Sequence, residues 1–539
     1  MRTGKLRFLA LLLALAMLLS GCRLSLLIDL LEQLSTGGEG IVHYSDMEYT
    51  RPDMEHFRQV LEKSCETART SETFPLVVSA INAFYGVYDD FYTNYNLADV
   101  RYSRDLTDVY WEAEQSFCME NAAEVDAGLE ELYYALAESP VREHLEGEDY
   151  FGPGYFDAYE GDSPWDPGFL KLMEKEAALL GEYYDLVEAS GAEEYYSDAY
   201  FDHYTMPMTE LFVELIRVRQ EIADYIGYGS YADFAYDQYY YRDYTAAQAV
   251  DYLARVRDTL YQQYCGVSVS EIWDTVSGYC SEADTFAYVK TAAEAMGGDI
   301  AQAFSLLEKA GLCDIAYGEN KYDTSYEVYL WNYASPFVYM CPYQIQTDKL
   351  TFAHEFGHFA NVYVCGGSYV GTDIAEVHSQ AFEYLSLCYG ENTQALAKYK
   401  MADSLCTYME NAAYAMFEHQ VYGLTGDALT AEAVLDLYRQ IGSDYGFDSV
   451  EWDPRDLITI PHFFTQPMYV ISYVVSNDVA MQLYQRELQS AGAGLEAYAQ
   501  CLYSQDSYII AFAQQYGLES PFAEGRLEKV SQTFQTALK

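Results

Sequence analysis

Basic residues are scarce in this chain. It holds only 30 lysines and arginines among 539 residues, against 84 aspartates and glutamates, which gives a formal net charge of −54. Binding to a nucleic-acid backbone requires a basic face, and adsorption to anionic lipid requires basic clusters. The composition therefore argues against both, and we expect no nucleic-acid partner. It favours solubility and cationic or neutral substrates.

Proline and paired cysteines are also sparse. There are 13 prolines, and the 11 cysteines form no C-x-x-C pair, which argues against a structural zinc ribbon. Scattered cysteines in apolar helical patterns favour buried free thiols, although disulfides stay possible outside the cytosol. In contrast, hydrophobic residues make up 50% of the chain and tyrosines number 56. A chain this apolar has a large buried core and is not disordered.

Long apolar runs are absent after residue 19, so no later segment is expected to span a membrane. Residues 8–19 form an apolar run that follows three basic residues and ends in Ser-Gly-Cys22. This pattern is typical of a bacterial lipoprotein signal, with residues 1–21 removed and Cys22 lipidated; the alternative is an ordinary secretory signal. We predict a tether over residues 22–45. The protein would be extracytoplasmic and would touch the cell membrane only through its lipid anchor.

Helical periodicity dominates the remaining sequence. Apolar residues recur at i, i+3 and i+4, which predicts helices, one of them ending near Asn96. Strand signals are confined to residues 326–330 and 336–340, which are rich in aromatic and β-branched residues. We therefore predict an all-α, mostly helical fold with a small β element. The length favours two helical lobes, an N-terminal lobe over 46–200 and a catalytic domain over 201–539.

An HExxH motif stands at residues 354–358. Two histidines four positions apart lie on one face of a helix, so His354 and His358 can bind the same Zn²⁺. Glu355 lies between them, where it can take a proton from zinc-bound water and pass it to a leaving amine. The alternative is two unrelated histidines on a helix. The motif predicts a zinc-dependent peptidase, and we expect the small β element to lie near its active site.

A catalytic zinc needs a third protein ligand. The next acidic segment places four polar side chains on one helical face: Asp373, Glu376, Gln380 and Glu383. We predict Glu376 as the ligand, with Asp373 and Glu383 accepting hydrogen bonds from the imidazole N–H groups. A solvated acidic face is the alternative, and the apolar flanks disfavour it. His378 should point away, because two residues turn a helix by about 200°.

Together these motifs resemble the oligoendopeptidase F and thimet oligopeptidase family of zinc metallopeptidases. The matching stretches are residues 354–358, the glycine-rich loop 365–368 and residues 372–380, with weaker matches elsewhere after about residue 200. The resemblance implies one zinc ion per chain, with Glu376 completing its site. It also implies two mostly helical lobes around a deep cleft that admits short, flexible peptides.

The same resemblance implies that the oxyanion is stabilised by donors from a C-terminal helix and loop. The matching residues are His462 and Tyr473, followed by Tyr469. A phenol or imidazole donor placed there would stabilise the negative charge that develops in the transition state. Phe464 and Ile471 stand where tyrosine is usual in the family, so the acting hydroxyl stays open.

These residues predict a monomeric zinc endopeptidase that cleaves oligopeptides, with Glu355 as general base. We expect the strand at 336–340 to pair with an extended substrate. One alternative is a carboxypeptidase or dipeptidyl-carboxypeptidase on the same scaffold, which would need a cationic anchor for the substrate carboxylate. Another is a peptide-capturing lipoprotein without turnover, for which a damaged motif would be expected.

Overall fold

The computed structural model describes residues 42–147, 150–160, 167–190, 197–368, 370–447 and 452–538. The expected signal segment 1–21, the lipidation site Cys22 and nearly all of the tether 22–45 lie outside the described residues. Within the described ranges, no helix is both long and apolar enough to cross a membrane.

Helices dominate the architecture, and one three-stranded sheet accompanies them, so the predicted fold class is confirmed. The N-terminal elements are η2 (Tyr44–Asp46), α2 (Met54–Thr70), α3 (Phe74–Ser103), α4 (Val109–Ala137), α5 (Arg142–Leu145) and η3 (Tyr155–Tyr159). The elements from there to the sheet are α6 (Pro167–Ser190), α7 (Asp198–Ile226), α8 (Tyr231–Phe234), the π-helical η4 (Ala235–Tyr239), α9 (Ala246–Tyr264), α10 (Val269–Trp273), α11 (Glu282–Met296) and α12 (Gly298–Ala310).

The sheet and the C-terminal helices complete the chain. The sheet consists of β1 (Cys313–Asp314), β2 (Ser325–Leu330) and β3 (Ser335–Met340), with η5 (Trp331–Tyr333) between the last two. The helices that follow are α13 (Asp348–Cys365), α14 (Thr372–Tyr389), α15 (Gln394–Val421), η6 (Gly426–Ala428), α16 (Ala431–Tyr445), η7 (Pro454–Thr459), α17 (Pro461–Thr465), α18 (Ile471–Gln489), α19 (Ala493–Cys501), α20 (Ile509–Gln515) and α21 (Arg526–Ala537).

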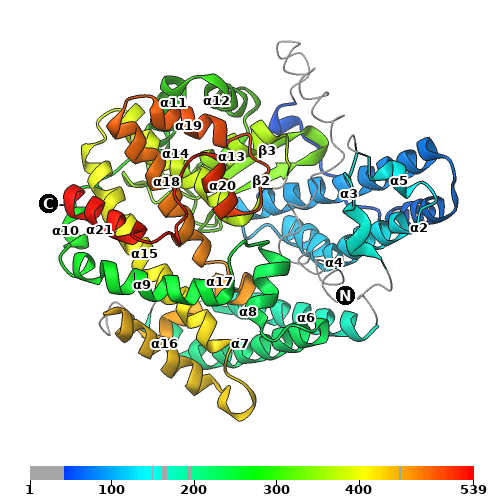
Figure 1. Ribbon diagram of the computed structural model, residues 1–539, viewed down its shortest axis with the longest axis horizontal. Coiled ribbons are helices and arrows are strands. Elements are labelled where there is room, and N and C mark those ends of the chain that lie inside the picture. The colour runs from blue at the N-terminus through cyan, green and yellow to red at the C-terminus, as the bar shows by residue number, and fades with distance from the viewer. Residues whose placement is uncertain are drawn as a thin grey trace.

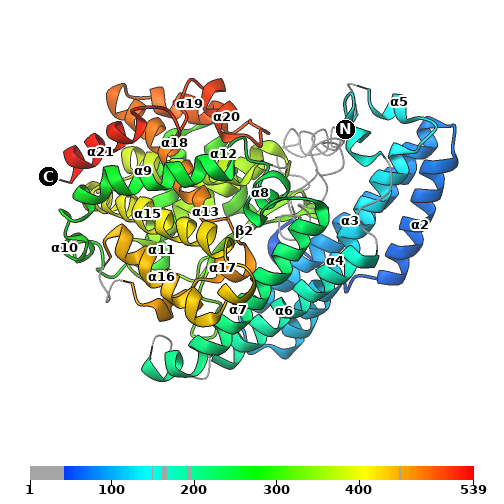
Figure 2. The same cartoon turned by 60° about the horizontal axis from the view of Figure 1, so that its bottom comes forward.

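Two hydrophobic cores hold these elements together. The smaller core lies among α2, α3, α4 and η3, and the larger one joins the helices from α6 onward. Figures 1 and 2 show α2 to α5 standing to one side of a larger helical body. Tyr329 in β2 and Trp331 at the start of η5 are buried in the smaller core, so the sheet connects the two parts.

Helix α3 is longer than its sequence pattern indicates. It continues through Asn96 to Ser103, so the expected end near Asn96 is wrong. The Asn96 side chain donates a hydrogen bond of 2.8 Å to the Tyr329 carbonyl, and Leu97 is fully buried. Tertiary contacts with the sheet thus favour continuation of the helix at a residue that often ends one.

Strand β3 is the central strand of the sheet. The order is β1-β3-β2, with β2 antiparallel to β3 along its full length and β1 parallel to it over two residues. Our expectation that residues 336–340 pair with a substrate is therefore wrong, because β3 already has a neighbour on each side. Among the described residues, no strand pairs with the other side of β2, so β2 forms the edge of the sheet next to the long pairing.

The cysteines form no disulfide among the described residues, and five of the ten there are buried. Burial raises the pKa of the Cys365 thiol to about 12. Burial was expected of most of these thiols, and it holds for half of them.

Candidate metal centre

Helices α13 and α14 pack at very short range around Gly357, the fourth residue of the HExxH motif. A Cβ atom at Gly357 would lie 2.5 Å from the Ser379 Cα and 2.7 Å from the His378 carbonyl oxygen. Real Cβ contacts are not that short, so only glycine permits the approach. This contact brings the acidic face of α14 against the histidines of α13.

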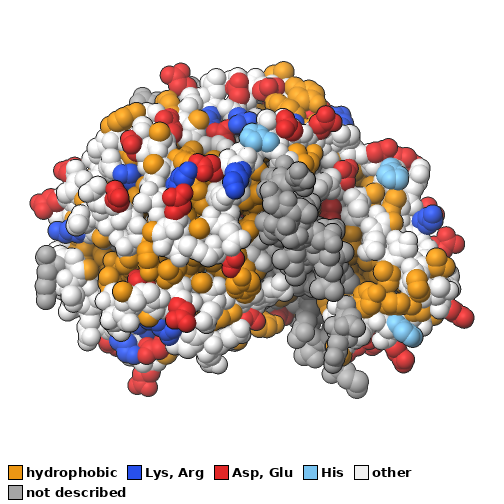
Figure 3. Space-filling model, turned by 90° about the horizontal axis from the view of Figure 1, so that it is seen from above, with side chains coloured by type: hydrophobic (Ala, Val, Ile, Leu, Met, Phe, Trp, Pro, Cys, Tyr) orange, Lys and Arg blue, Asp and Glu red, His pale blue; other side chains and the backbone are white. Residues whose placement is uncertain are grey.

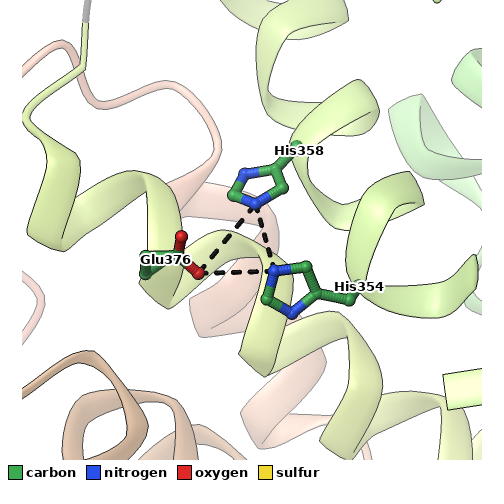
Figure 4. A group of neighbouring side chains, drawn as sticks. All are labelled: His354, His358 and Glu376. Atoms are coloured by element: carbon green, nitrogen blue, oxygen red, sulfur yellow. Dashed lines mark hydrogen bonds and ion pairs between the residues drawn. The ribbon is translucent and has the colours of Figure 1, made fainter. Parts of the chain in front are cut away.

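The three predicted ligands meet at this contact (Figure 4). The Nε2 atoms of His354 and His358 are 3.2 Å apart, and Glu376 Oε2 lies 3.4 Å from the first and 4.0 Å from the second. Ligand atoms about 2.0–2.1 Å from a tetrahedral zinc are about 3.3 Å from one another. The donor set and its spacing therefore fit a single metal ion.

The ligand charges depend on one another. Burial lowers the pKa of His354, but hydrogen bonds to Glu376 and Glu383 outweigh it and raise that pKa well above its usual range. Burial lowers the pKa of His358 to about 4. Burial opposes ionisation of Glu376 too, yet His354 and its neighbours hold that pKa at about 2. Without a metal, a proton on His354 balances the Glu376 carboxylate.

Glu355 lies on the same helix and is buried. Burial raises its pKa to about 7, with further contributions from the charges of Glu376 and Glu383 and an opposing one from His354. A carboxyl group with a pKa near neutrality can both accept and return a proton at physiological pH. This environment suits the general-base role that the motif predicts.

Glu383 supports His354 from behind, as expected. It accepts a hydrogen bond of 2.8 Å from His354 Nδ1, and its other oxygen lies 2.6 Å from Lys400 Nζ. Sequence reasoning missed Lys400. Its only signal was a lysine in an apolar stretch, and here it is buried within α15. Burial raises the pKa of Glu383, but Lys400 and His354 outweigh it and lower that pKa.

The structure corrects the role expected of Asp373. Instead of accepting from an imidazole, it accepts hydrogen bonds from Ser472 (2.5 Å) and Tyr244 (2.9 Å), and Arg242 Nε lies 3.5 Å away. Asp373 is one helical turn before Glu376 and faces the segment that leads into α9 rather than α13. Arg242 also donates to the Met468 carbonyl at 2.9 Å, so this buried cluster fixes the loop before Tyr469.

The three residues expected to stabilise the oxyanion gather beside Glu376. The Tyr469 hydroxyl donates to Glu376 Oε1 at 2.7 Å, and the Tyr473 hydroxyl lies 3.4 Å from His462 Nε2. The two phenol rings are 5.3 Å apart. Burial lowers the pKa of His462 and raises those of both tyrosines well above their usual range. All three are therefore neutral hydrogen-bonding groups near pH 7.

The remaining candidates lie away from the metal. Phe464 is fully buried and stacks on Tyr183 with ring centroids 4.4 Å apart, and Ile471 is also buried. Both positions are part of the core and offer no hydroxyl. His378 is fully buried with neither ring nitrogen hydrogen-bonded, and it is not among the grouped donors. It points away from the centre, as the helical spacing predicts.

Comparisons with known proteins identify one matching family and several similar folds. Residues 44–163 match the peptidase M3 N-terminal domain family. No curated protein sequence matches the chain. Among solved structures, one assigned as an oligoendopeptidase F has a TM-score of 0.79 at 20% identity, covering 92% of this chain and 98% of the other. PZ peptidase A, solved with an inhibitor, has a TM-score of 0.79 at 19% identity over the same shares.

A Bacillus anthracis protein assigned as an oligoendopeptidase F has a TM-score of 0.77 at 20% identity, covering 93% of this chain and 98% of the other. At these identities the structural likeness defines the fold. Together with the family match of residues 44–163, it confirms the resemblance to the oligoendopeptidase F family. The fold is similar to that of these oligoendopeptidase structures, and residues 44–163 match the N-terminal domain of M3 peptidases.

Proposed function

We propose that this protein is a zinc-dependent endopeptidase that hydrolyses short, flexible oligopeptides. The observation that carries the proposal is the convergence of His354, His358 and Glu376 at the spacing of zinc ligands, with buried Glu355 on the same helix. The family match and the oligoendopeptidase F folds support the substrate class. Two histidines and a carboxylate on helices favour zinc among the divalent metals.

The side chains of the centre have complementary roles in this proposal. A zinc ion held there would supply Lewis-acid activation of water and of the scissile carbonyl. Glu355 takes the proton of the attacking water and returns it to the amine that leaves. Tyr473 and His462 donate to the developing oxyanion, and Tyr469, which is bonded to Glu376, is the further candidate.

Strand β2 provides an edge for an extended substrate. The Val338 N–H in β3 donates to the Leu312 carbonyl on the β1 side, and Glu327 is the residue opposite Val338 in β2. In such an antiparallel pair, both residues direct their backbone groups away from each other. The N–H and C=O of Glu327 therefore point to the open edge, where a peptide backbone can pair with them.

The direct test is cleavage of an internally quenched peptide blocked at both ends, using purified full-length protein with and without a zinc chelator. We expect internal cleavage that the chelator abolishes and zinc restores. Trimming only of peptides with a free C-terminus would instead show a carboxypeptidase, and tight binding without turnover would show peptide capture.

The role of Glu355 has its own test. Glu355→Gln should keep zinc and lose at least about 10²-fold in kcat, in line with general-base contributions. Metal analysis and single-turnover cleavage measure the two quantities separately. A wild-type rate in this variant would contradict the assignment.

The cellular setting remains a proposal as well. We propose a monomer tethered to the bacterial cell membrane through lipidated Cys22, with no nucleic-acid partner. Mass spectrometry of the N-terminal peptide from cells would detect the lipid. An unmodified Cys22 peptide, or a mature chain that begins after residue 22, would contradict the anchor.

A further inference from the structure

Glu327 occupies the middle of β2, the strand with the open edge. Its side chain alternates with that of Tyr326, which stacks on Tyr339 and donates to Ser103 on the α3 side of the sheet. Tyr329 lies on the other face, because a Cβ atom at Gly367, just after α13, would meet the Tyr329 ring at 2.4 Å. Residues two apart share a face, so Glu327 also faces α13.

Glu327 interacts electrostatically with another acid. Burial raises the pKa of Glu327 to about 8, and the charge of Glu355 on α13 adds to it. One carboxylate oxygen of Glu327 is buried with no hydrogen-bond partner. Across the described ranges, no lysine or arginine pairs with this acid. Glu327 is thus a half-buried acid that interacts with the predicted catalytic base and has no counter-ion among the described residues.

An extended peptide at the β2 edge would place one side chain next to this acid. Because the backbone groups of Glu327 point outward, the substrate residue opposite it forms the hydrogen-bonded pair. Residues directly opposite in such a pair have side chains on the same face, with Cβ atoms about 4.5–5.5 Å apart. A lysine or arginine at that substrate position would reach the Glu327 carboxylate, which an uncharged aliphatic side chain would leave unpaired.

We propose that Glu327 is a specificity-determining residue that selects a lysine or arginine side chain at the substrate position pairing with it on β2. The inference deepens the proposed endopeptidase function and depends on it. A half-buried carboxylate bonded to a cation can discriminate between substrates, because an uncharged competitor forfeits a charge-assisted hydrogen bond and leaves the buried oxygen unpaired. The net charge of −54 adds long-range attraction for cationic peptides. Figure 3 shows acidic side chains spread over the visible face rather than gathered in one patch. The long-range attraction therefore does not by itself favour a cation at one particular position of the substrate.

The test uses pairs of internally quenched, end-blocked peptides that differ only by lysine or norleucine, with the pair placed at each position around the cleaved bond. Full-length wild type, Glu327→Gln and the control Glu319→Gln are compared by kcat/KM, and mass spectrometry locates each cut. Glu319 is an exposed acid in the loop before β2, so its variant controls for the lost charge alone.

We expect wild type and Glu319→Gln to prefer lysine over norleucine by at least tenfold at one position. Glu327→Gln should lose most of that preference, because its kcat/KM for the lysine peptide should fall towards its kcat/KM for the norleucine peptide. If Glu327→Gln fails to fold, Glu327→Asp provides the test, because it should retain a preference for lysine.

Three results would overturn the inference. One is equal cleavage of both peptides of every pair by wild type. Another is an equal change for both peptides in Glu327→Gln, which would mean that the residue acts through Glu355 or the fold. A third is an aspartate variant that cleaves without preference. Failure to cleave any peptide would contradict the proposed function itself, and this inference with it.

Discussion

The acids of α14 and the acid of β2, two elements beside the candidate centre, have different partners. On α14, Asp373 lies beside Arg242, Glu376 bonds His354 and Tyr469, and Glu383 bonds His354 and Lys400. On β2, Glu327 has one buried carboxylate oxygen without a partner among the described residues, and the charge that acts on its pKa is that of another acid, Glu355.

In our proposal, the acids of α14 bind a metal ion that stays in the protein, whereas Glu327 binds a cationic side chain of the substrate. An uncompensated buried carboxylate is costly, so acids that hold a permanent metal are anchored by fixed donors. An acid left without a donor keeps its capacity for a cation that arrives with the substrate.

Replacing the α14 ligand should abolish the centre. Glu376→Ala removes one of three donors and leaves His354 without its main counter-charge. We expect substoichiometric zinc and a loss of at least about 10³-fold in kcat/KM. Metal analysis beside cleavage assays checks both. Glu327→Gln is the matched control and should retain one zinc per chain; full zinc occupancy in Glu376→Ala would contradict the ligand assignment.

Removing an oxyanion donor should have the next largest effect. Tyr473→Phe deletes the hydroxyl next to His462, and the loss of one such donor lowers kcat by about 10²- to 10³-fold. Tyr469→Phe should cost less, because its hydroxyl bonds the metal ligand Glu376. Steady-state kinetics on zinc-loaded enzyme would measure both variants. The opposite order would identify Tyr469 as the donor.

Removing Lys400, the cation that pairs with Glu383, should lower the affinity for zinc rather than the catalytic rate of the zinc-loaded protein. Lys400→Met leaves Glu383 without its cation, and outer-shell changes of this kind cost about 10- to 100-fold in metal affinity. Zinc affinity can be measured by competition with a coloured chelator. Lys290→Met is the control, because Lys290 forms an exposed ion pair with Glu308 away from the centre. Equal zinc affinity in both variants would show that Lys400 has no part in metal binding.

The smallest effect is a pH dependence of zinc binding. Glu376 and Glu383 outweigh burial and raise the pKa of His354, so the metal-free protein holds a proton there at neutral pH. Zinc needs the neutral imidazole and must displace that proton. Its affinity should therefore rise about tenfold per pH unit between pH 6 and 7.5, with about one proton released. Calorimetry in buffers of different ionisation enthalpy counts the proton. An affinity independent of pH would contradict the charge balance.

The parts of this centre that could be predicted from sequence are those set by local geometry. The spacing of His354 and His358 puts them on one helical face whatever the surrounding fold, and Glu376 follows on the next helix. The mostly helical class followed from the period of apolar residues. His462, Tyr469 and Tyr473 were found through the family resemblance, since nothing in their own spacing marks them.

The other parts depend on long-range packing. Lys400 and Arg242 reach the centre from α15 and from the segment before α9, and no periodic pattern connects them to α14. The edge role of β2 depends on the strand order, which two apolar stretches do not specify. The continuation of α3 past Asn96 required the contact with Tyr329. Sequence reasoning therefore missed the cations that pair with the acids of α14 but lie far from them along the chain.

The most direct measurement is a crystal structure of zinc-loaded Glu355→Gln with an end-blocked, lysine-containing peptide, with zinc located by anomalous scattering. We predict a single zinc peak among His354 Nε2, His358 Nε2 and Glu376 Oε2. The peptide should lie antiparallel to β2, with the lysine ammonium against Glu327. A zinc peak elsewhere, or a peptide bound away from the β2 edge, would contradict the account.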